Sequence, residues 1–294
     1  MPISLENLWI PLVLLYGIFK GTREILKKKA LNFNSGLEIL LIYTLFSFVL
    51  TLPSVTEAFK ITNLWLYAAI ALKSFFVFVA WICGITALTK MPLSIYGVLD
   101  LSGVLFSTLL AVLIVGEKPT LTVISGMVIV CAGLFFLKFQ PKSKQIKSET
   151  NEKIAVKYVI LAFCYTLFNS MSGTMDKLFM RNNSVSTNQL QFWFMFFLCV
   201  YYIAYFLIKK IPVNWKTALK NYRIYIMAIL LILGDKALFI ANSGASTVSV
   251  MILLKQISCV VVIIGGRIFF KEKNTLYKLF CAAIIICGIV ISTL

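Results

Sequence analysis

Histidine is absent from this 294-residue chain, and acidic residues are few: 11 aspartates and glutamates against 28 lysines and arginines. Without histidine the chain lacks the commonest metal ligand and the usual proton shuttle near neutral pH. Charged residues make up only 13% of the chain, about half their share in soluble domains. An enzyme acting on lipid-linked substrates would need histidine or paired carboxylates. We therefore expect no metal, no cofactor and no enzyme.

Cysteine is present without the pattern of a disulfide or metal framework. The seven cysteines are odd in number, form no CxxC pair and all fall within hydrophobic segments. In such segments a free cysteine behaves as a small apolar side chain. They are Cys83, Cys131, Cys164, Cys199, Cys259, Cys281 and Cys287.

Hydrophobic residues dominate instead, at 60% of the chain with a mean hydropathy of +0.93. Apolar stretches of about 20 residues recur, each long enough to cross the hydrocarbon core of a bilayer. We predict an all-α integral membrane protein. Its ten predicted spans are residues 8–26, 37–53, 64–88, 93–115, 119–137, 158–176, 189–208, 224–242, 246–268 and 275–294.

The hydrophobic pattern occurs twice. Shifting residues 67–136 by 155 positions places them on residues 222–291 without a gap, so that Tyr67 meets Tyr222 and Gly133 meets Gly288. A basic linker separates the two halves. The predicted units are residues 1–140, the linker 141–157 and residues 158–294. Because five spans is an odd number, the second half must enter the membrane from the opposite side, which predicts two inverted five-helix repeats.

The net charge of +17 reflects lysine and arginine in short loops beside the spans. This arrangement favours contact with membrane lipids and gives no reason to expect nucleic acid. Most of these residues follow spans one, three, five, seven and nine, and the opposite side has four: Lys60, Lys118, Lys177 and Arg181. By the positive-inside rule, both termini lie outside the cytoplasm. The first span has no signal-peptide flanks, so we expect it to be retained.

The turns and glycines carry a family resemblance. The short turn Thr89–Ser94, the Gly-Glu-Lys turn at 116–118 and the spaced Gly126 and Gly133 resemble the drug/metabolite transporter superfamily, specifically its EamA-type members. The second half repeats this layout at Ser246–Ser249, Glu272-Lys273 and Gly288. The resemblance implies an alternating-access carrier of small metabolites with a cavity lined by both halves. It also implies cytoplasmic termini, opposite to the side that the lysines indicate.

Charged residues inside spans mark candidate sites, because each is costly in the membrane. The 155-residue offset makes Asp100 and Lys255 equivalents, each about 5 Å from the midplane. They are candidates to hold a zwitterion between an acidic and a basic group; a structural ion pair, such as Asp235 with Lys255, is the alternative. Near span ends, Glu38, Asp176, Arg267 and Lys278 are expected to reach the interface.

The remaining candidates lie on other spans. Lys20 and Glu24 stand one turn apart and are expected to neutralise each other. Asn169 is expected to face the cavity, whereas its neighbours Ser170 and Ser172 suit helix packing. Three further residues are candidates for the cavity wall with packing as the alternative: Trp81, Tyr96 and Gln256.

The leading hypothesis is a secondary transporter of a small polar or zwitterionic metabolite such as an amino acid. Protonation of Asp100, Glu24 or Asp235 would allow coupling to a proton gradient. The alternative is a flippase for lipids or lipid-linked substrates with the same inverted fold. We expect a bacterial cytoplasmic (plasma) membrane location, contact with membrane lipids, and a monomer or homodimer.

Overall fold

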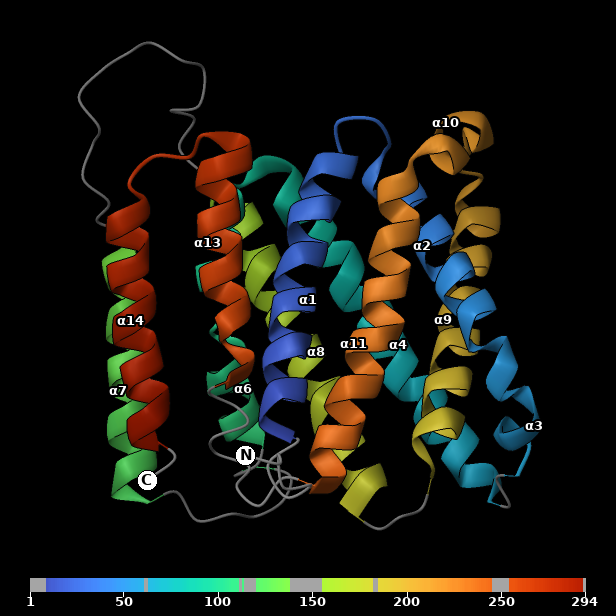
Figure 1. Ribbon diagram of the computed structural model, residues 1–294, viewed down its shortest axis with the longest axis horizontal. Coiled ribbons are helices and arrows are strands. Elements are labelled where there is room, and N and C mark those ends of the chain that lie inside the picture. The colour runs from blue at the N-terminus through green and yellow to red at the C-terminus, as the bar shows by residue number, and fades with distance from the viewer. Residues whose placement is uncertain are drawn as a thin grey trace, which may run out of the picture.

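The computed structural model describes residues 9–60, 63–110, 113, 120–137, 155–181, 185–244 and 254–292. Within these ranges the chain is helical and has no strand. The long helices stand beside one another across the molecule, as Figure 1 shows. The predicted turn at 116–118, Ser246–Ser249 and residues 141–154 of the predicted linker lie outside the described residues.

The helices fall into two sets on either side of the linker. The first set is α1 (Trp9–Ala30), α2 (Gly36–Thr51), η2 (Leu52–Ser54), α3 (Val55–Ala58), α4 (Leu64–Lys90), α5 (Leu93–Asp100), α6 (Gly103–Leu110) and α7 (Leu121–Phe136). The second set is α8 (Val156–Arg181), α9 (Thr187–Lys209), α10 (Trp215–Lys220), α11 (Tyr222–Gly244), α13 (Ile257–Phe270) and α14 (Thr275–Ser292).

Four helical segments among the described residues are long and apolar enough to cross a membrane: Gly36–Ala58, Leu64–Lys90, Leu93–Leu110 and Thr187–Lys209. Three shorter helices, α7, α13 and α14, are also apolar. The long helices α1, α8 and α11 carry charged residues along their length. The apolar runs therefore predict the helices well, and the count of ten spans stays a prediction.

Sequence signals explain where several helices begin. Ser35 and Glu38 form a capping box at the start of α2, and Ser186 and Gln189 form another at the start of α9. In each box the serine hydroxyl accepts a backbone N–H and the longer side chain accepts the serine N–H, which satisfies donors that the helix leaves free.

Helices from the two sets alternate through the molecule. Helix α1 packs against α11 and α13, while α8 packs against α4 and α6. Helix α2 contacts α11, and α4 contacts α9. The pairs α2 with α9, α5 with α13, and α7 with α14 also join the two sets. The fold is therefore held together mainly by contacts between the halves.

Glycines allow α7 and α14 to approach closely at one edge of the molecule (Figure 1). A methyl group on Gly288 would meet the carbonyl oxygen of Gly126 and the side chain of Val130, and one on Gly133 would meet Ile285. Low residue numbers on one helix thus lie beside high numbers on the other, so the two helices are antiparallel. The absence of a side chain at these positions is what lets the backbones meet.

The predicted span 93–115 is interrupted. Helix α5 ends at Asp100, and α6 begins at Gly103 after a tightened turn in which Ser102 N–H donates to Leu99 O at 3.0 Å. Before α13, Gln256 forms a similar turn, where its carbonyl accepts Cys259 N–H at 2.9 Å. Short-range hydrogen bonds of this kind inside a long helix often mark a hinge. The breaks come directly after Asp100 and Lys255.

Basic residues gather where α1, α4, α9 and α13 end, a face we call the lysine-rich side. Several contacts bring these ends together: Lys28 Nζ donates to Met91 O at 2.8 Å, and Lys29 Nζ lies 3.5 Å from the centre of the Phe269 ring. Other basic residues at these helix ends include Lys90, Lys209 and Lys271. The clustering agrees with one side of the membrane being basic.

Candidate functional site

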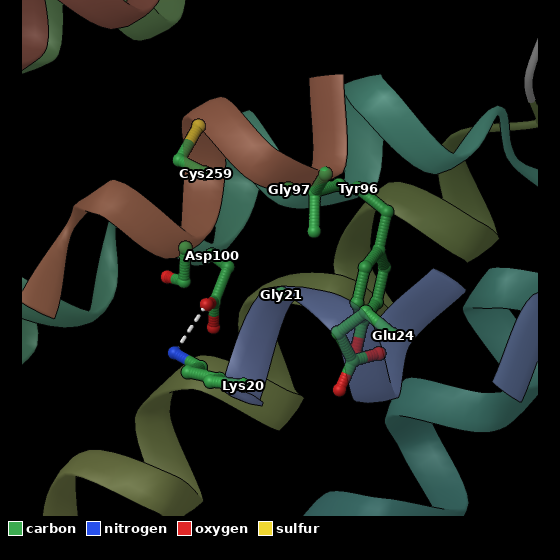
Figure 2. A pocket seen from close by; sticks show the side chains of 9 residues that line it. Lys20, Gly21, Glu24, Tyr96, Gly97, Asp100 and Cys259 are labelled. Carbon is green, nitrogen blue, oxygen red and sulfur yellow. Dashed lines mark hydrogen bonds and ion pairs between the residues drawn. The ribbon is translucent and has the colours of Figure 1, made fainter. Parts of the chain in front are cut away.

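A small cavity of about 10 Å³ lies between α1, α5 and α13 (Figure 2). This volume holds about one water molecule. Three of its lining residues are charged, namely Lys20, Glu24 and Asp100. The other lining residues are Gly21, Tyr96, Gly97, Ser258, Cys259 and Val262.

An ion pair joins two of the predicted site residues. Lys20 Nζ on α1 lies 2.6 Å from Asp100 Oδ2, the last residue of α5 (Figure 2). The side chains are 24% and 18% exposed. The sequence predicts that Asp100 and Lys255 hold a ligand between them. Among the described residues, Asp100 forms its ion pair with Lys20. Asp100 reaches α1 because α5 ends there and packs against that helix.

Glu24 lies one turn further along α1 and pairs with Lys27 rather than with Lys20. Lys27 Nζ is 2.6 Å from Glu24 Oε1. Lys20 interacts electrostatically with Glu24, as expected, but its ion-pair partner is Asp100 from another helix. Glu24 Oε2 is buried and has no hydrogen-bond partner among the described residues. A buried carboxylate oxygen without a donor is an acceptor ready for water or a bound group.

Aromatic and small residues form the rest of the wall. Tyr96 on α5 is buried, and its ring centre lies 5.4 Å from that of Tyr165 on α8. Figure 2 shows Glu24 beside Tyr96 and Cys259 near Asp100. Ser258 and Cys259 come from α13, directly after the turn at Gln256. Residues of both halves thus meet at the cavity.

A second charged cluster lies between α4, α8 and α9. Lys73 is 3% exposed; its Nζ is 3.2 Å from Asp176 Oδ1 and 3.7 Å from the centre of the Phe194 ring. Asp235 on α11 interacts electrostatically with Lys73 and with Arg23. The cluster compensates the charge of a deeply buried lysine by an ion pair and a cation–π contact.

The other predicted site residues lie outside the cavity lining. Trp81 packs against Tyr43, with ring centres 5.3 Å apart, which fits the packing alternative. Asn169 is half-buried on α8, and the neighbouring Ser170 hydroxyl donates to Gly103 O at 2.8 Å. Lys255 precedes the turn at Gln256 and interacts electrostatically with Asp176.

Two residues expected at the membrane interface turn inward instead. Lys278 is 3% exposed; its Nζ donates to Ser94 Oγ at 2.5 Å and lies 3.1 Å from Glu272 Oε2. Asp176 pairs with Lys73. Position near a span end predicts snorkelling, but a nearby opposite charge holds each side chain inside: Lys73 of α4 for Asp176, and Glu272 between α13 and α14 for Lys278. Glu272 and Lys278 are charged residues near helix ends that have no evident partner in the sequence, and this feature could have identified them.

Comparison with known proteins adds to this geometry. Residues 7–139 match the model of the EamA-like transporter family. The matched segment is a little under half of the chain, and over it the chain is similar to that family. The resemblance inferred from the short turns and spaced glycines is therefore confirmed. The match supports a membrane transporter of the drug/metabolite transporter superfamily, and it leaves the substrate open.

The whole chain also has the fold of a solved protein. One crystal structure superposes with a TM-score of 0.65 over 97% of this chain and 96% of that chain, at 12% sequence identity. At this identity the likeness concerns the fold alone. No curated protein matches the chain. The comparisons therefore give a family similarity over residues 7–139 and a fold over nearly the whole chain, and the cargo must be argued from the chain's own residues.

Proposed function

We propose that this chain is an alternating-access secondary transporter of a small zwitterionic metabolite such as an amino acid, built as two inverted five-helix repeats. The repeats are residues 1–140 and 158–294, joined by the linker 141–157. The observation that carries the proposal is the cavity between the halves, where Lys20 and Asp100 pair beside a break in a helix.

Contacts between the helices support the inverted repeat. If α1, α2, α4 and α7 correspond to α8, α9, α11 and α14, then exchanging the halves converts two major pairings into other observed pairings: α1 with α11 becomes α8 with α4, and α4 with α9 becomes α11 with α2. The offset of 155 residues also converts Gly133 beside Ile285 into Gly288 beside Val130. Reciprocal contacts of this kind are expected from a pseudo-two-fold axis.

The broken helices support a central site. Under the same offset, Leu101 corresponds to Gln256, and both carbonyls accept the N–H three residues later, from Val104 and from Cys259. Interrupted helices near the membrane midplane are where carriers with inverted repeats hold their cargo, since helix ends supply free backbone groups there. Asp100 and Lys255 precede the two breaks.

The charges support a zwitterion. Lys20 is matched by Asp100, and Glu24 by Lys27, so each lining charge has an opposite partner. A solute that enters between Lys20 and Asp100 separates the pair. It must then offer a carboxylate to Lys20 and an ammonium group to Asp100. A simple cation would leave Lys20 unpaired in a medium of low dielectric, which is costly. The buried Glu24 Oε2 adds an acceptor for a donor on the solute.

A thermal-shift screen of the purified protein against amino acids, organic acids, amines and nucleosides tests the proposal. A zwitterion should raise the melting temperature, because a ligand that binds the folded state stabilises it. The shift should vanish in Lys20→Met and Asp100→Asn, and persist in Glu57→Gln, which removes a charge near α9 far from the cavity. A zwitterion shift that survives both cavity substitutions would refute the site.

Reconstituted vesicles test transport itself. Uptake of the solute found by the screen should increase when a proton gradient is imposed, if Asp100, Glu24 or Asp235 takes up the proton. Uptake that is the same with and without the gradient would refute proton coupling and leave the carrier standing. Movement of a fluorescent phospholipid across the same vesicles, without uptake of any soluble zwitterion, would favour the flippase.

A further inference from the structure

The turn between α4 and α5 is held from both sides on the lysine-rich side. Lys28 of α1 donates to the carbonyl oxygens of Leu88 and Met91 at the end of α4. The carbonyl end of a helix carries partial negative charge, so a lysine is stabilising there. This contact lies within the first half of the chain.

The other side of the turn is held by the second half. Glu272, between α13 and α14, accepts the backbone N–H groups of Leu93 at 2.5 Å and Ser94 at 3.1 Å, as well as the Ser94 hydroxyl. Lys278 donates to both Ser94 and Glu272. These are charge-assisted hydrogen bonds at the positive end of α5, where a carboxylate is most stabilising.

Helix α5 connects this contact to the cavity. It has eight residues, and is therefore about 12 Å long. Its first residues are bound by Glu272, and its last residue, Asp100, is bound by Lys20. The turn at Leu101–Ser102 separates it from α6. A short rigid helix with a hinge behind it transmits a displacement at one end to the other.

The side chains that contact the two ends of α5 differ in exposure. The side chains of Lys20 and Asp100 are 24% and 18% exposed, whereas those of Glu272 and Lys278 are 10% and 4% exposed. The contact of Glu272 and Lys278 is therefore packed more deeply within the protein than the ion pair at the cavity.

We propose that Glu272 is a gating residue: its hydrogen bonds to α5 close the lysine-rich side, and α5 links their release to the breaking of the Lys20–Asp100 pair. This inference rests on the proposed alternating access. It assigns a role to a residue that does not touch the cavity and acts through α5.

Access to Cys259 tests the gate directly. Cys259 is 2% exposed and lines the cavity, so in a variant keeping only this cysteine it reports opening. The test uses a membrane-impermeant maleimide added to either side of sealed vesicles. A separate variant whose only cysteine is Lys209→Cys identifies the lysine-rich side. Glu272→Gln should speed the reaction of Cys259 from that side at least about tenfold, since a hydrogen bond to a charged group is worth that much.

Glu38→Gln is the matched control. Glu38 also accepts backbone N–H groups on the lysine-rich side, from Ser35 and Asn214, but it does not contact α5. This variant should change the rate less than about twofold, as exposed substitutions do. An unchanged rate in Glu272→Gln, or an equal increase from both sides of the membrane, would overturn the gate.

A disulfide gives the converse test. In the double variant Ser94→Cys/Glu272→Cys, oxidation should close the lysine-rich side, abolish labelling of Cys259 from that side, and be reversed by reduction. Labelling that continues after the cross-link has formed would overturn the proposal. Because neither experiment requires the solute, a failed ligand screen and a failed gate are separate results.

Discussion

Two regions join the same halves of the molecule by different means. At the edge, α7 and α14 meet through glycines, with backbone close to backbone. At the centre, α1, α5 and α13 surround a cavity in which charged side chains pair. Packing at the edge depends on the shape of the two helices, and a bound molecule cannot replace these contacts. The pairs at the centre can be replaced by another molecule with the same charges, which suits contacts that must break and re-form.

The largest expected effect is at the centre. Lys20→Met should reduce uptake of the solute at least about hundredfold and lower the stability, because Asp100 is left unpaired. The double variant Lys20→Met/Asp100→Leu should regain the stability but not the uptake, since apolar residues can replace an ion pair and cannot bind a zwitterion. Thermal unfolding and vesicle uptake measure the two effects. Recovery of uptake in the double variant would make the pair structural.

Substitutions in the Lys73 cluster should lower the stability of the protein. Lys73→Met leaves Asp176 without its ion-pair partner and should cost about 2–3 kcal/mol of stability. Adding Asp176→Leu should restore most of that loss. Thermal unfolding of the single and double variants checks both values. A single variant as stable as the natural chain would mean that Asp176 is compensated by other charges.

At the edge, Gly288→Ala should cost about 1–3 kcal/mol, because its methyl group would meet the Gly126 carbonyl. Gly173 on α8 is the control, since nothing lies within 4 Å of the place its methyl group would occupy. Gly173→Ala should be neutral or slightly stabilising, as alanine favours helices. Equal unfolding temperatures for the two variants would mean that α7 and α14 do not need close contact.

The smallest effect is expected at Trp81. Replacing it with leucine removes the ring contact with Tyr43 and should cost about 1 kcal/mol. Solute affinity should stay within about twofold, since Trp81 does not line the cavity. Titration of the solute against the variant gives the affinity. A tenfold loss of solute affinity would show that Trp81 is part of the binding site.

The sequence predicts the helices of this chain well because long apolar runs carry that information locally. The predicted start of the fourth span at residue 93 coincides with the start of α5. The break after Asp100 is not predicted, since Asp100, Ser102 and Gly103 lie inside a longer hydrophobic segment that reads as one span. Its signal is a turn of short-range hydrogen bonds, which depends on packing between α5 and the helices around it.

The sequence identifies charged residues of the site but not their partners. Lys20, Glu24 and Asp100 are all found at the cavity, where Lys20 forms its ion pair with Asp100 and Glu24 forms its own with Lys27. Ion pairs between helices depend on how α1 and α5 rotate against each other, which the spacing along one helix does not encode. Lys278 was misjudged for the same reason, because Glu272 reaches it only once α13 and α14 fold together.

The ion pairs have an electrical consequence. The Lys20–Asp100, Glu24–Lys27 and Lys73–Asp176 pairs each sum to zero charge, so moving any of them as a unit moves no net charge. A membrane potential exerts about 2.3 kcal/mol per 100 mV on each unpaired elementary charge and nothing on a neutral pair. A carrier whose cargo is a zwitterion and whose mobile charges are paired would respond to the membrane potential only through a coupled proton.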